Sequence, residues 1–494
     1  MQQYQTFIFD AYSFNPEEGI IELHYSLDGD LHFTETLILP QGYKQQALST
    51  ELDSAFRALH LIAGISYYKT CCPKQIAVKT GTLTQEQSAF WDTVYEKGLG
   101  EFFYKNRIDF RGLINFPGVE QTANSKQQTG PASQSPISNP SPSRSGGTSP
   151  RSYDQQTLSL NILNATAKPG NPQPRILVPI GGGKDSTVTI ELLKKAGYDV
   201  TLFRIGHHPL IEQTAAVAGR PLLTVERRLD PLLFRLNANG ALNGHVPITA
   251  YLSLLSVVIA KLYGFSAVVM SNERSANEGN VSYLGEKINH QWSKSLESER
   301  LIQTYLKKIG ISVQYFSLLR PFSELAIAKM FSGFPQYFPC TTSCNTNWKI
   351  ANRQSPISSR WCGGCPKCAF VFVMFAAFLP LKTLQEIFGQ NLFDTEALQP
   401  LYRQLLGLEG FKPFECVGTP EETKAAFLLA HERGELDQTK AMQLFLLEVL
   451  PTMKDSKKLI EDALTPSPDH SIPNHFLPCV SSAESHPRRG AALP

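Results

Sequence analysis

Residues 176–197 read ILVPIGGGKDSTVTIELLKKAG, and this stretch decides the fold. An apolar run that stops at Gly181, Gly182 and Gly183 predicts a buried strand ending in a tight turn. From Ser186 onward the apolar residues recur with helical spacing, so a helix follows the turn directly. Such a turn leaves backbone N–H groups unpaired, and together with the helix dipole these favour a phosphate or pyrophosphate.

The same alternation of strand and helix continues along the chain. We expect strands at residues 175–180, 200–205, 222–225 and 267–270, and helices at 186–196, 211–218 and 248–262. This pattern predicts an α/β fold, a doubly wound parallel sheet with helices on both faces. Ligands of such sheets bind beyond the carboxyl ends of the strands, so the turns after Ile180, Ile205 and Met270 are expected to share one crevice.

Composition divides the 494 residues into five parts. We expect an N-terminal α+β domain (1–118), a disordered Ser/Pro-rich linker (119–170), the α/β domain (171–335), a cysteine knuckle with a helical region (336–465) and a disordered tail (466–494). The linker and the tail carry too little apolar surface to offset their ordering entropy.

The first domain contains two local signals. Residues 20–39 alternate in polarity on either side of Asp28-Gly29, which predicts a β-hairpin. A capping box formed by Thr84 and Gln87 predicts a helix over residues 84–95. Nothing in this domain carries recognisable chemistry.

Charge and hydrophobicity exclude several classes of protein. The formal net charge of +2 gives no general electrostatic case for nucleic-acid binding. The first ten residues, MQQYQTFIFD, lack the pattern of a signal peptide. The longest apolar stretch, residues 368–381, is too short to span a bilayer and predicts a buried helix. We therefore expect a cytoplasmic protein without nucleic-acid or membrane partners.

Nine cysteines are present, and five of them fall within residues 340–368. This crowding favours a metal site in a reducing compartment over a disulfide framework. Cys362, Cys365 and Cys368 bring three thiolates together, and Cys344 completes four soft ligands suited to structural zinc. Cys340 is an alternative to Cys344, or lies free near the active site.

Polar residues follow the strand at 267–270, at the edge of the sheet where ligands are expected. Arg274 is suited to gripping a carboxylate in a fork. The His207-His208 pair follows the second strand in the same way. The donors and acceptors after the fourth strand are Ser271, Asn272, Glu273, Arg274, Ser275, Asn277, Glu278 and Asn280.

The turn GGGKDS resembles the SGGxDS loop of the PP-loop ATPases, which cleave ATP between the α and β phosphates. It lacks the spacing of a GxxxxGK[ST] loop and of GxGxxG. Gly181 stands where the PP-loop family usually has serine, which puts one hydroxyl contact to the pyrophosphate in doubt. This loop alone also fits tRNA-thiolating enzymes, amidotransferase synthetase domains and 7-cyano-7-deazaguanine synthases.

Four stretches together are more specific: VPIGGGKDS, IGHHPLIEQTA, SNERSANEGN, and PCTTSCN followed by WCGGCPKC. They resemble the UDP-N-acetylmuramoyl-L-alanyl-L-glutamate epimerases of bacterial peptidoglycan synthesis. The resemblance implies an isomerase that inverts the terminal L-glutamate of a UDP-linked muramoyl dipeptide through a carboxyl-adenylate, converting ATP to AMP and diphosphate. It also implies Mg²⁺ as a cofactor beside ATP and the structural Zn²⁺.

The resemblance assigns roles to residues as hypotheses. Backbone N–H groups of the turn would hold the β,γ-phosphates, and Asp185 would orient the loop or help to hold Mg²⁺. The expected nucleotide-binding residues are Gly181, Gly182, Gly183, Lys184, Asp185, Ser186 and His207. The expected substrate-binding residues are Ser271, Asn272, Asn277, Asn280 and Lys287. The expected catalytic residues are Asp185, Glu273, Arg274 and Glu278.

The base that removes the Cα proton stays open among Glu273, Glu278, His207, His208, His290, Lys287 and Cys340. Two other functions stay open as well. One is a PP-loop enzyme of nucleoside or tRNA modification, such as a 7-cyano-7-deazaguanine synthase-like ligase. The other is a nucleotide sensor without turnover.

Overall fold

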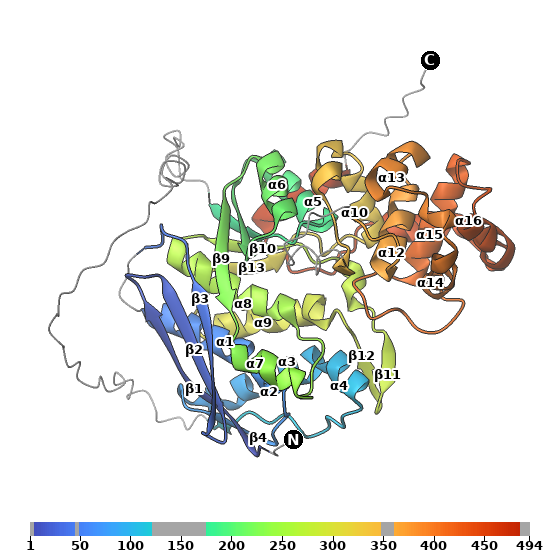
Figure 1. Cartoon of the computed structure of the whole chain (residues 1–494). Coiled ribbons are helices and arrows are strands. Elements are labelled where there is room, and N and C mark those ends of the chain that lie inside the picture. Colours follow the sequence, from blue (N-terminus) through green and yellow to red (C-terminus); the bar gives the residue numbers. More distant parts are fainter. Residues whose placement is uncertain (1–3, 45–48, 121–173, 347–359, 485–494) are drawn as a thin grey trace, which may run out of the picture.

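The structure is a computed structural model, and it describes residues 4–44, 49–120, 174–346 and 360–484 (Figure 1). The linker expected over residues 119–170 lies outside the described residues from residue 121 onward. Residues 347–359, between the first and second cysteines of the expected knuckle, lie outside them as well.

One large sheet organises the described chain, with strands in the order β13-β10-β7-β8-β9-β3-β2-β1-β4. Its parallel part consists of β13 (Gln314–Ser317), β10 (Ala267–Met270), β7 (Arg175–Pro179), β8 (Asp199–Ile205) and β9 (Leu222–Arg228). From β7 the chain moves outward through β8 and β9, then returns to β10 on the other side of β7. The order therefore reverses between β7 and β10, and such a switch point is where doubly wound sheets bind ligands.

Helices cover both faces of the parallel strands (Figure 1). One face carries α5 (Lys184–Lys195) and α6 (Pro209–Ala218), and the other carries α8 (Ile248–Tyr263) and α9 (Leu296–Lys308). Alternate side chains of β7 enter the two cores, as the pleat of a strand requires. The prediction of an α/β fold with a parallel sheet is confirmed.

Helix α5 starts two residues earlier than expected, at Lys184, because Gly183 is its N-cap with extended backbone angles. The polar residues Lys184 and Asp185 thus form the first helical turn, which apolar periodicity alone does not reveal. The glycine-rich turn between β7 and α5 is therefore shorter than the sequence analysis predicts.

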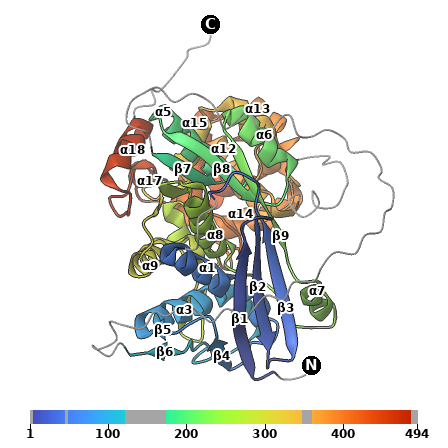
Figure 2. The same cartoon turned by 90° about the vertical axis from the view of Figure 1, so that its left-hand side faces the viewer.

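The N-terminal strands extend the same sheet. They are β1 (Thr6–Asn15), β2 (Ile20–Leu27), β3 (Leu31–Ile38) and β4 (Gln75–Val78). The predicted hairpin is β2–β3, and the positive φ angles of Asp28 (55°) and Gly29 (80°) suit a tight hairpin turn. Figure 2 shows β1 to β3 continuing beside β9, with which β3 pairs antiparallel. The first 118 residues therefore share backbone hydrogen bonds with the α/β part.

A buried ion pair fastens this junction. The Arg227 guanidinium on β9 donates to Glu35 on β3 at 2.8 and 3.0 Å. The hydroxyls of Tyr251 and Tyr67 donate to the same carboxylate at 2.9 and 3.3 Å. Glu35 is fully buried, and both of its oxygens are hydrogen-bonded. We call these four residues the Glu35 network.

Helices of the N-terminal part pack on the α8 side of the sheet, and α1 lies against α8. The predicted capping box of Thr84 and Gln87 is present at the start of α3. The helices and short strands of this part are α1 (Thr50–Ala63), α2 (Ile65–Tyr68), β5 (Leu83–Thr84), α3 (Gln85–Gly98), α4 (Gly100–Asn106) and β6 (Gly118–Val119).

The C-terminal region is helical and packs on the α5 side. The apolar run expected to be a buried helix is α12 (Pro366–Ala376), and each of its residues from Lys367 to Ala376 is buried. The remaining helices and strands are α7 (Pro231–Ala238), β11 (Val281–Tyr283), β12 (Glu286–Ile288), α10 (Glu324–Phe331), α13 (Leu381–Phe388), α14 (Gln399–Leu405), α15 (Pro420–Arg433), α16 (Lys440–Leu444), α17 (Ser456–Leu464) and α18 (Leu477–Glu484).

The expectation of a disordered tail from residue 466 is wrong for its described part. Phe476 is fully buried, with its ring 4.8 Å from that of Tyr198 and 4.7 Å from that of Phe316. The Ser467 amide donates to the Pro321 carbonyl at 2.8 Å. A few apolar side chains suffice here because the folded sheet already offers them a surface. Residues 485–494 lie outside the described chain.

Within the described ranges, no helix combines the length and apolar character needed to cross a bilayer.

Candidate functional site

The glycine-rich turn lies at the switch point, between β7 and α5. Gly182 has a φ of 75°, which favours glycine. A Cβ atom placed on Gly181 would meet nothing within 4 Å, and one on Gly183 nothing nearer than 3.8 Å. The Gly182 carbonyl accepts a hydrogen bond from the Thr342 amide at 3.0 Å. The turn is therefore held in place while the space above it stays open for a ligand.

Three carboxylates gather beside the turn. Asp185 is in the first turn of α5, Glu273 follows β10, and Glu324 opens α10. One oxygen of each lies within 4.8 Å of the others, and Glu273 and Glu324 are 1% exposed. Burial raises the pKa of Glu324 to about 7, with the charge of Asp185 adding to the shift and the Lys184 ammonium opposing it. We call these residues the acidic trio.

Ammonium groups compensate the acidic trio. Lys184 is buried, and its Nζ contacts the carboxylates of both Asp185 and Glu324. Burial opposes the ionisation of Asp185, but the charges of Lys184, Lys367 and Lys294 hold the pKa of its carboxyl below the usual value. Since carboxylates and ammonium groups balance, the crevice keeps its charges without a large net field.

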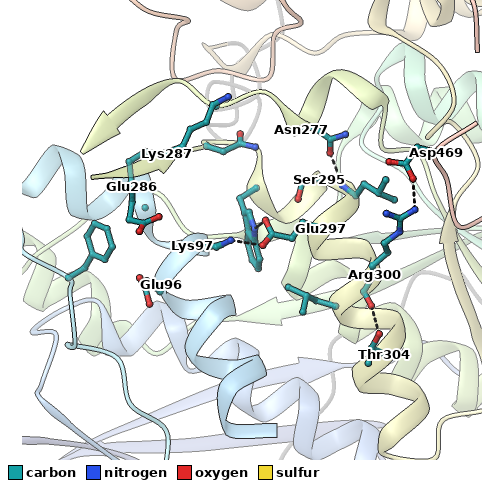
Figure 3. A pocket seen from close by; sticks show the side chains of 18 residues that line it. Glu96, Lys97, Asn277, Glu286, Lys287, Ser295, Glu297, Arg300, Thr304 and Asp469 are labelled. Carbon is teal, nitrogen blue, oxygen red and sulfur yellow. Dashed lines mark hydrogen bonds and ion pairs between the residues drawn. The ribbon is translucent and has the colours of Figure 1, made fainter. Parts of the chain in front are cut away.

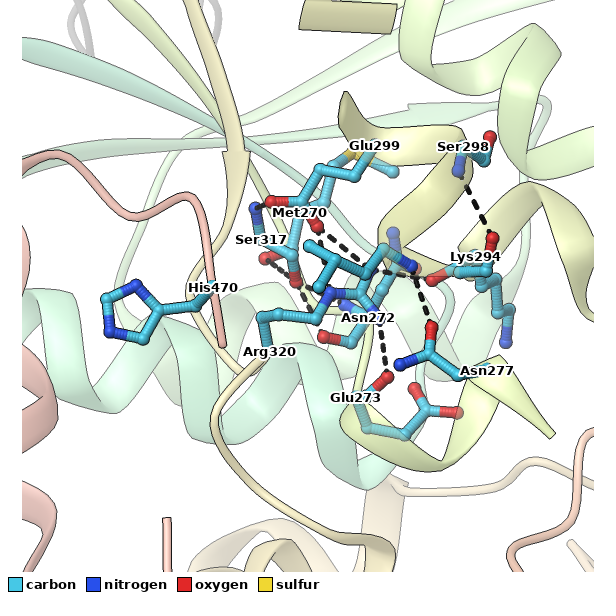
Figure 4. A network of polar contacts seen from close by, with 12 residues as sticks. Met270, Asn272, Glu273, Asn277, Lys294, Ser298, Glu299, Ser317, Arg320 and His470 are labelled. Atoms are coloured by element: carbon cyan, nitrogen blue, oxygen red, sulfur yellow. Dashed lines mark hydrogen bonds and ion pairs between the residues drawn. The ribbon is translucent and has the colours of Figure 1, made fainter. Parts of the chain in front are cut away.

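A second buried network fixes the backbone of the site (Figure 4). Arg320, 1% exposed, donates from Nε to Glu299 at 2.9 Å. Its other nitrogens donate to the carbonyls of Glu273 and Lys294, both at 2.6 Å. Arg320 therefore sets the positions of two crevice residues through their main chain.

A thiol lies next to the crevice. Lys294 Nζ donates to Cys416 Sγ at 3.4 Å, and Lys367 contacts the Cys416 carbonyl. The His290 imidazole hydrogen-bonds the thiol, and its Nδ1 contacts the Glu101 carboxylate. Burial alone would raise the pKa of Cys416, but Lys294, His290 and Lys367 together lower it to about 6.

Only some residues of the polar stretch after β10 lie beside the acidic trio. Glu273 belongs to the acidic trio, and Ser271 Oγ is buried with no hydrogen-bond partner among the described residues. The Arg274 guanidinium instead donates to the carbonyls of Thr465 and Asp462, at 3.1 and 3.2 Å. Arg274 thus ties the loop to the C-terminal segment.

The side-chain amides of Asn280 and Asn277 bond the protein's own backbone, and Asn272 is held through its main-chain N–H. Asn280 Nδ2 donates to the carbonyls of Lys412 and Pro413, at 3.1 and 2.7 Å. Asn277 Oδ1 accepts from the Leu296 amide at 2.8 Å. The Asn272 amide donates to a serine hydroxyl at 2.7 Å, and the residue is buried. Their expected roles in substrate binding stay predictions.

Other expected residues lie apart from the acidic trio. Lys287 and Glu278 form an exposed pair at 3.1 Å, and the side chain of His207 is 78% exposed beside Glu212. Residue His208 caps α6. Cys340 is buried, and its Sγ donates to the Tyr337 carbonyl at 3.4 Å.

A pocket of about 690 Å³ lies between the N-terminal helices and α9 (Figure 3). Four of its charged side chains form ion pairs with one another, Lys97 with Glu297 at 2.5 Å and Arg300 with Asp469 at 2.5 Å. Its acidic side chains are Glu96, Glu286, Glu297 and Asp469, against the basic Lys97, Lys287 and Arg300. This charge balance does not favour phosphates in the pocket.

The four cysteines predicted as metal ligands converge. Their sulfurs all lie within 4.8 Å of one another, with pairs at 3.9 Å (Cys344 and Cys365), 3.7 Å (Cys362 and Cys368) and 3.5 Å (Cys365 and Cys368). A tetrahedron with Zn–S bonds of about 2.3 Å has edges of about 3.8 Å, so the spacing fits zinc. Cys340 is not in the group, which decides between it and Cys344.

Several crevice residues escaped the sequence analysis: Glu324, Lys294, Lys367, Arg320 and Cys416. Lys367 lies between Cys365 and Cys368, so its place near the site could have been predicted from the position of the cysteine knuckle. The other four carry no motif, and only folding brings them together.

The fold and the site define an α/β protein with a charged, partly unsatisfied crevice at the switch point of its sheet. Comparison with known protein families agrees with this fold class and identifies the family. The chain belongs to the MurL family: the MurL N-terminal domain matches residues 1–139 and 152–318, and the MurL C-terminal domain matches residues 340–459.

Three curated relatives carry the name UDP-N-acetyl-alpha-D-muramoyl-L-alanyl-L-glutamate epimerase. The protein from Micromonospora sp. is 36% identical over 97% of this chain and 99% of its own. Those from Xanthomonas oryzae pv. oryzae and Salinispora tropica are also 36% identical, over 95% and 98% of this chain and 96% and 97% of their own. Among solved structures, a predicted subunit of tRNA methyltransferase from Methanocaldococcus jannaschii has a TM-score of 0.22 at 20% identity, covering 32% of this chain and 76% of that one, which carries no argument.

Proposed function

We propose that this protein epimerises the terminal L-glutamate of UDP-N-acetylmuramoyl-L-alanyl-L-glutamate to D-glutamate, consuming ATP to AMP and diphosphate. It is then an isomerase of peptidoglycan precursor synthesis. The observation that carries the proposal is the match, over nearly the whole chain, to relatives named for this reaction. The crevice at the switch point supplies the chemistry that the reaction needs.

The chemistry explains why an epimerase would consume ATP. Removing the Cα proton beside a free carboxylate would place a second negative charge on the same few atoms. Adenylylation neutralises that carboxylate, and the carbonyl of the resulting acyl phosphate then accepts the developing charge. The half-buried Lys294 and the buried Lys367, beside the acidic trio, would stabilise that charge electrostatically.

The glycine-rich turn is our proposed site for the ATP phosphates. The first amides of α5 have no partner within the helix, and the open space over Gly181 lets an anion approach them. The acidic trio offers the oxygen ligands that Mg²⁺ prefers, so these three residues would hold the ion, and it would supply positive charge beside the phosphates. The Lys184 ammonium contacts two of these carboxylates, so it must move before the ion enters.

We propose a structural zinc ion for the four cysteines, because four thiolates leave no open position. Thr342 lies two residues before Cys344 and bonds the Gly182 carbonyl. The zinc would therefore stiffen the segment that holds the nucleotide turn. Native mass spectrometry should find one zinc per chain, and a mass without metal under gentle conditions would contradict this assignment.

The substrates also bear on location and partners. ATP and a UDP-linked precursor are cytoplasmic metabolites, so we place the reaction in the cytoplasm. Neither substrate requires a nucleic-acid or membrane partner.

The decisive experiment incubates the protein with ATP, Mg²⁺ and UDP-N-acetylmuramoyl-L-alanyl-L-glutamate. D-glutamate in the hydrolysed product and AMP in the nucleotide fraction should both appear. A parallel reaction without ATP should yield neither. Inversion without ATP, or AMP formation without inversion, would contradict the proposed function.

A further inference from the structure

Four segments far apart in the chain converge around Cys416. His290, which follows β12, contacts both the thiol and the carboxylate of Glu101 on α4. His245 Nδ1 lies 3.5 Å from the same carboxylate. Many enzymes activate a cysteine in this way: its sulfur is hydrogen-bonded to an imidazole, and a carboxylate orients that imidazole. We call Cys416, His290 and Glu101 the thiol relay.

Lys294 connects the thiol relay with the proposed nucleotide site. Its ammonium group donates a hydrogen bond to the Cys416 sulfur and also interacts electrostatically with the carboxylates of Glu273, Asp185 and Glu324. Glu273 is 1% exposed, yet its Oε2 has no hydrogen-bond partner in the described chain. An unsatisfied buried carboxylate oxygen is costly unless a ligand or ion completes it. Lys294 therefore links the thiol to the acidic trio.

Four of the other candidate bases are worse placed. Glu278 and Lys287 pair with each other at the surface, His207 is exposed, and Cys340 bonds the Tyr337 carbonyl. Cys416 is half-buried, so a substrate can reach it. The positive groups that face it are Lys294, His290, Lys367 and, on its own segment, Lys412. They favour the thiolate, the form that accepts a proton.

We propose that the Cys416 thiolate accepts the Cα proton of the activated glutamyl residue, an inference that rests on the epimerase function proposed above. A sulfur lone pair takes the proton, and the electron pair of the C–H bond moves into the acyl group to form an enolate. A water molecule donates a proton to Cα from the opposite face as the electron pair returns from the acyl group, which leaves hydroxide. The new thiol then releases its proton to solvent, which restores the thiolate and neutralises the hydroxide. His290 and Glu101 act as positioning residues.

The test separates carboxyl activation from proton transfer. Exchange of labelled pyrophosphate into ATP, with the dipeptide substrate present, reports adenylylation alone. Uptake of deuterium at Cα in D₂O reports proton transfer. Cys416→Ala should retain pyrophosphate exchange and lose deuterium uptake by at least about 100-fold, the usual contribution of a general base.

Cys71→Ser is the matched control, because Cys71 is a half-buried cysteine in the N-terminal part and touches none of the crevice groups named here. It should keep both activities. Deuterium uptake within a few-fold of wild type in Cys416→Ala would overturn the inference. Loss of both activities in a folded Cys416→Ala protein would overturn it as well, because Cys416 would then serve activation. Wild-type protein lacking both activities would refute the proposed function itself.

A second measurement needs no variant at Cys416. In wild type, deuterium uptake should rise with pH through about 6, the pKa that the surrounding cations give to the thiol. His290→Gln removes one of these groups, so its profile should move to higher pH. An unshifted midpoint would show that His290 has no influence on the titrating group, and a flat wild-type profile would exclude the thiolate as the base.

Discussion

The Glu35 network and the acidic trio are both buried clusters of charge, yet they differ in completeness. Glu35 faces one guanidinium and two tyrosine hydroxyls, and both of its oxygens are bonded. In the crevice, Glu273 Oε2 and Ser271 Oγ lack partners among the described residues. A buried charged cluster in which every polar atom has a hydrogen-bond partner stabilises the fold. A cluster with unpartnered polar atoms can bind a ligand that supplies the missing partners.

The Arg320 network resembles the Glu35 network in its completeness but supports the crevice. It bonds the main chain of Glu273 and Lys294 without presenting a group to the open space. Rigid, satisfied charges therefore lie directly behind the unsatisfied ones, which is how a site keeps its geometry before a ligand arrives.

The largest effect on stability should come from the Glu35 network. Glu35→Gln leaves the Arg227 charge buried without its counterion, which costs about 3–5 kcal/mol of unfolding free energy. Urea denaturation would measure this loss. The matched control is Glu226→Gln on β9, the strand of Arg227, whose exposed pair with Arg228 at 2.8 Å should contribute less than about 1 kcal/mol. Equal losses in the two variants would show that burial of the Glu35 network is unimportant.

The acidic trio should respond in activity more than in stability. Asp185→Asn removes a charge that faces the proposed phosphates, and we expect pyrophosphate exchange to fall by about 100- to 1000-fold. The loss of unfolding free energy should be smaller than in Glu35→Gln, because the Asp185 side chain is 25% exposed and Lys184 keeps Glu324 as a counterion. Asp199→Asn, an exposed change at the start of β8, should alter neither property. A large loss of stability with normal exchange would reverse the assignment.

The pH dependence of the unfolding free energy tests whether the ion pair of Glu101 with His290 stabilises the fold, as the Glu35 network does. Burial opposes ionisation of Glu101, but His290, Lys105 and His245 lower the pKa of its carboxyl to about 2. A lowered carboxyl pKa contributes stability above the ordinary value of 4.5, and that contribution is lost as the pH falls through about 2. The advantage of wild type over Glu101→Gln should thus shrink by up to about 3 kcal/mol across this range. An advantage independent of pH would contradict this.

The smallest effect concerns two neighbouring glycines of the turn. Gly182→Ala forces alanine into the left-handed region at φ 75° and should cost about 1–2 kcal/mol of stability. Gly181→Ala meets no atom within 4 Å, so stability should stay unchanged while pyrophosphate exchange falls, because the added methyl group enters the ligand space. Normal exchange in Gly181→Ala would place the phosphates elsewhere.

Local signals were read correctly where neighbouring residues decide the conformation. The hairpin turn at Asp28-Gly29, the capping box at Thr84 and the glycine-rich turn before α5 each depend on a few adjacent residues. The spacing of the cysteines also predicted that they converge, although the choice between Cys340 and Cys344 needed the folded positions of the sulfurs.

The errors arose where distant surfaces meet. The tail looked too polar to fold, but Phe476 finds a partner on the completed sheet. Arg274 and Asn280, which were expected at the substrate, bond carbonyls of segments more than a hundred residues away, and their expected roles stay predictions. A polar side chain in a sequence does not reveal whether its partner is a ligand or the protein's own backbone.

By itself the sequence determined the strands, the helices, the open glycine turn and the four thiolates, because hydrophobic periodicity and spacing act over short distances along the chain. Only the tertiary structure decided that β3 joins β9 and that Glu324 meets Asp185 and Glu273. It also brought Cys416 beside Lys294 and His290. The interaction of charges depends on separation in space, and for these residues folding alone sets that separation.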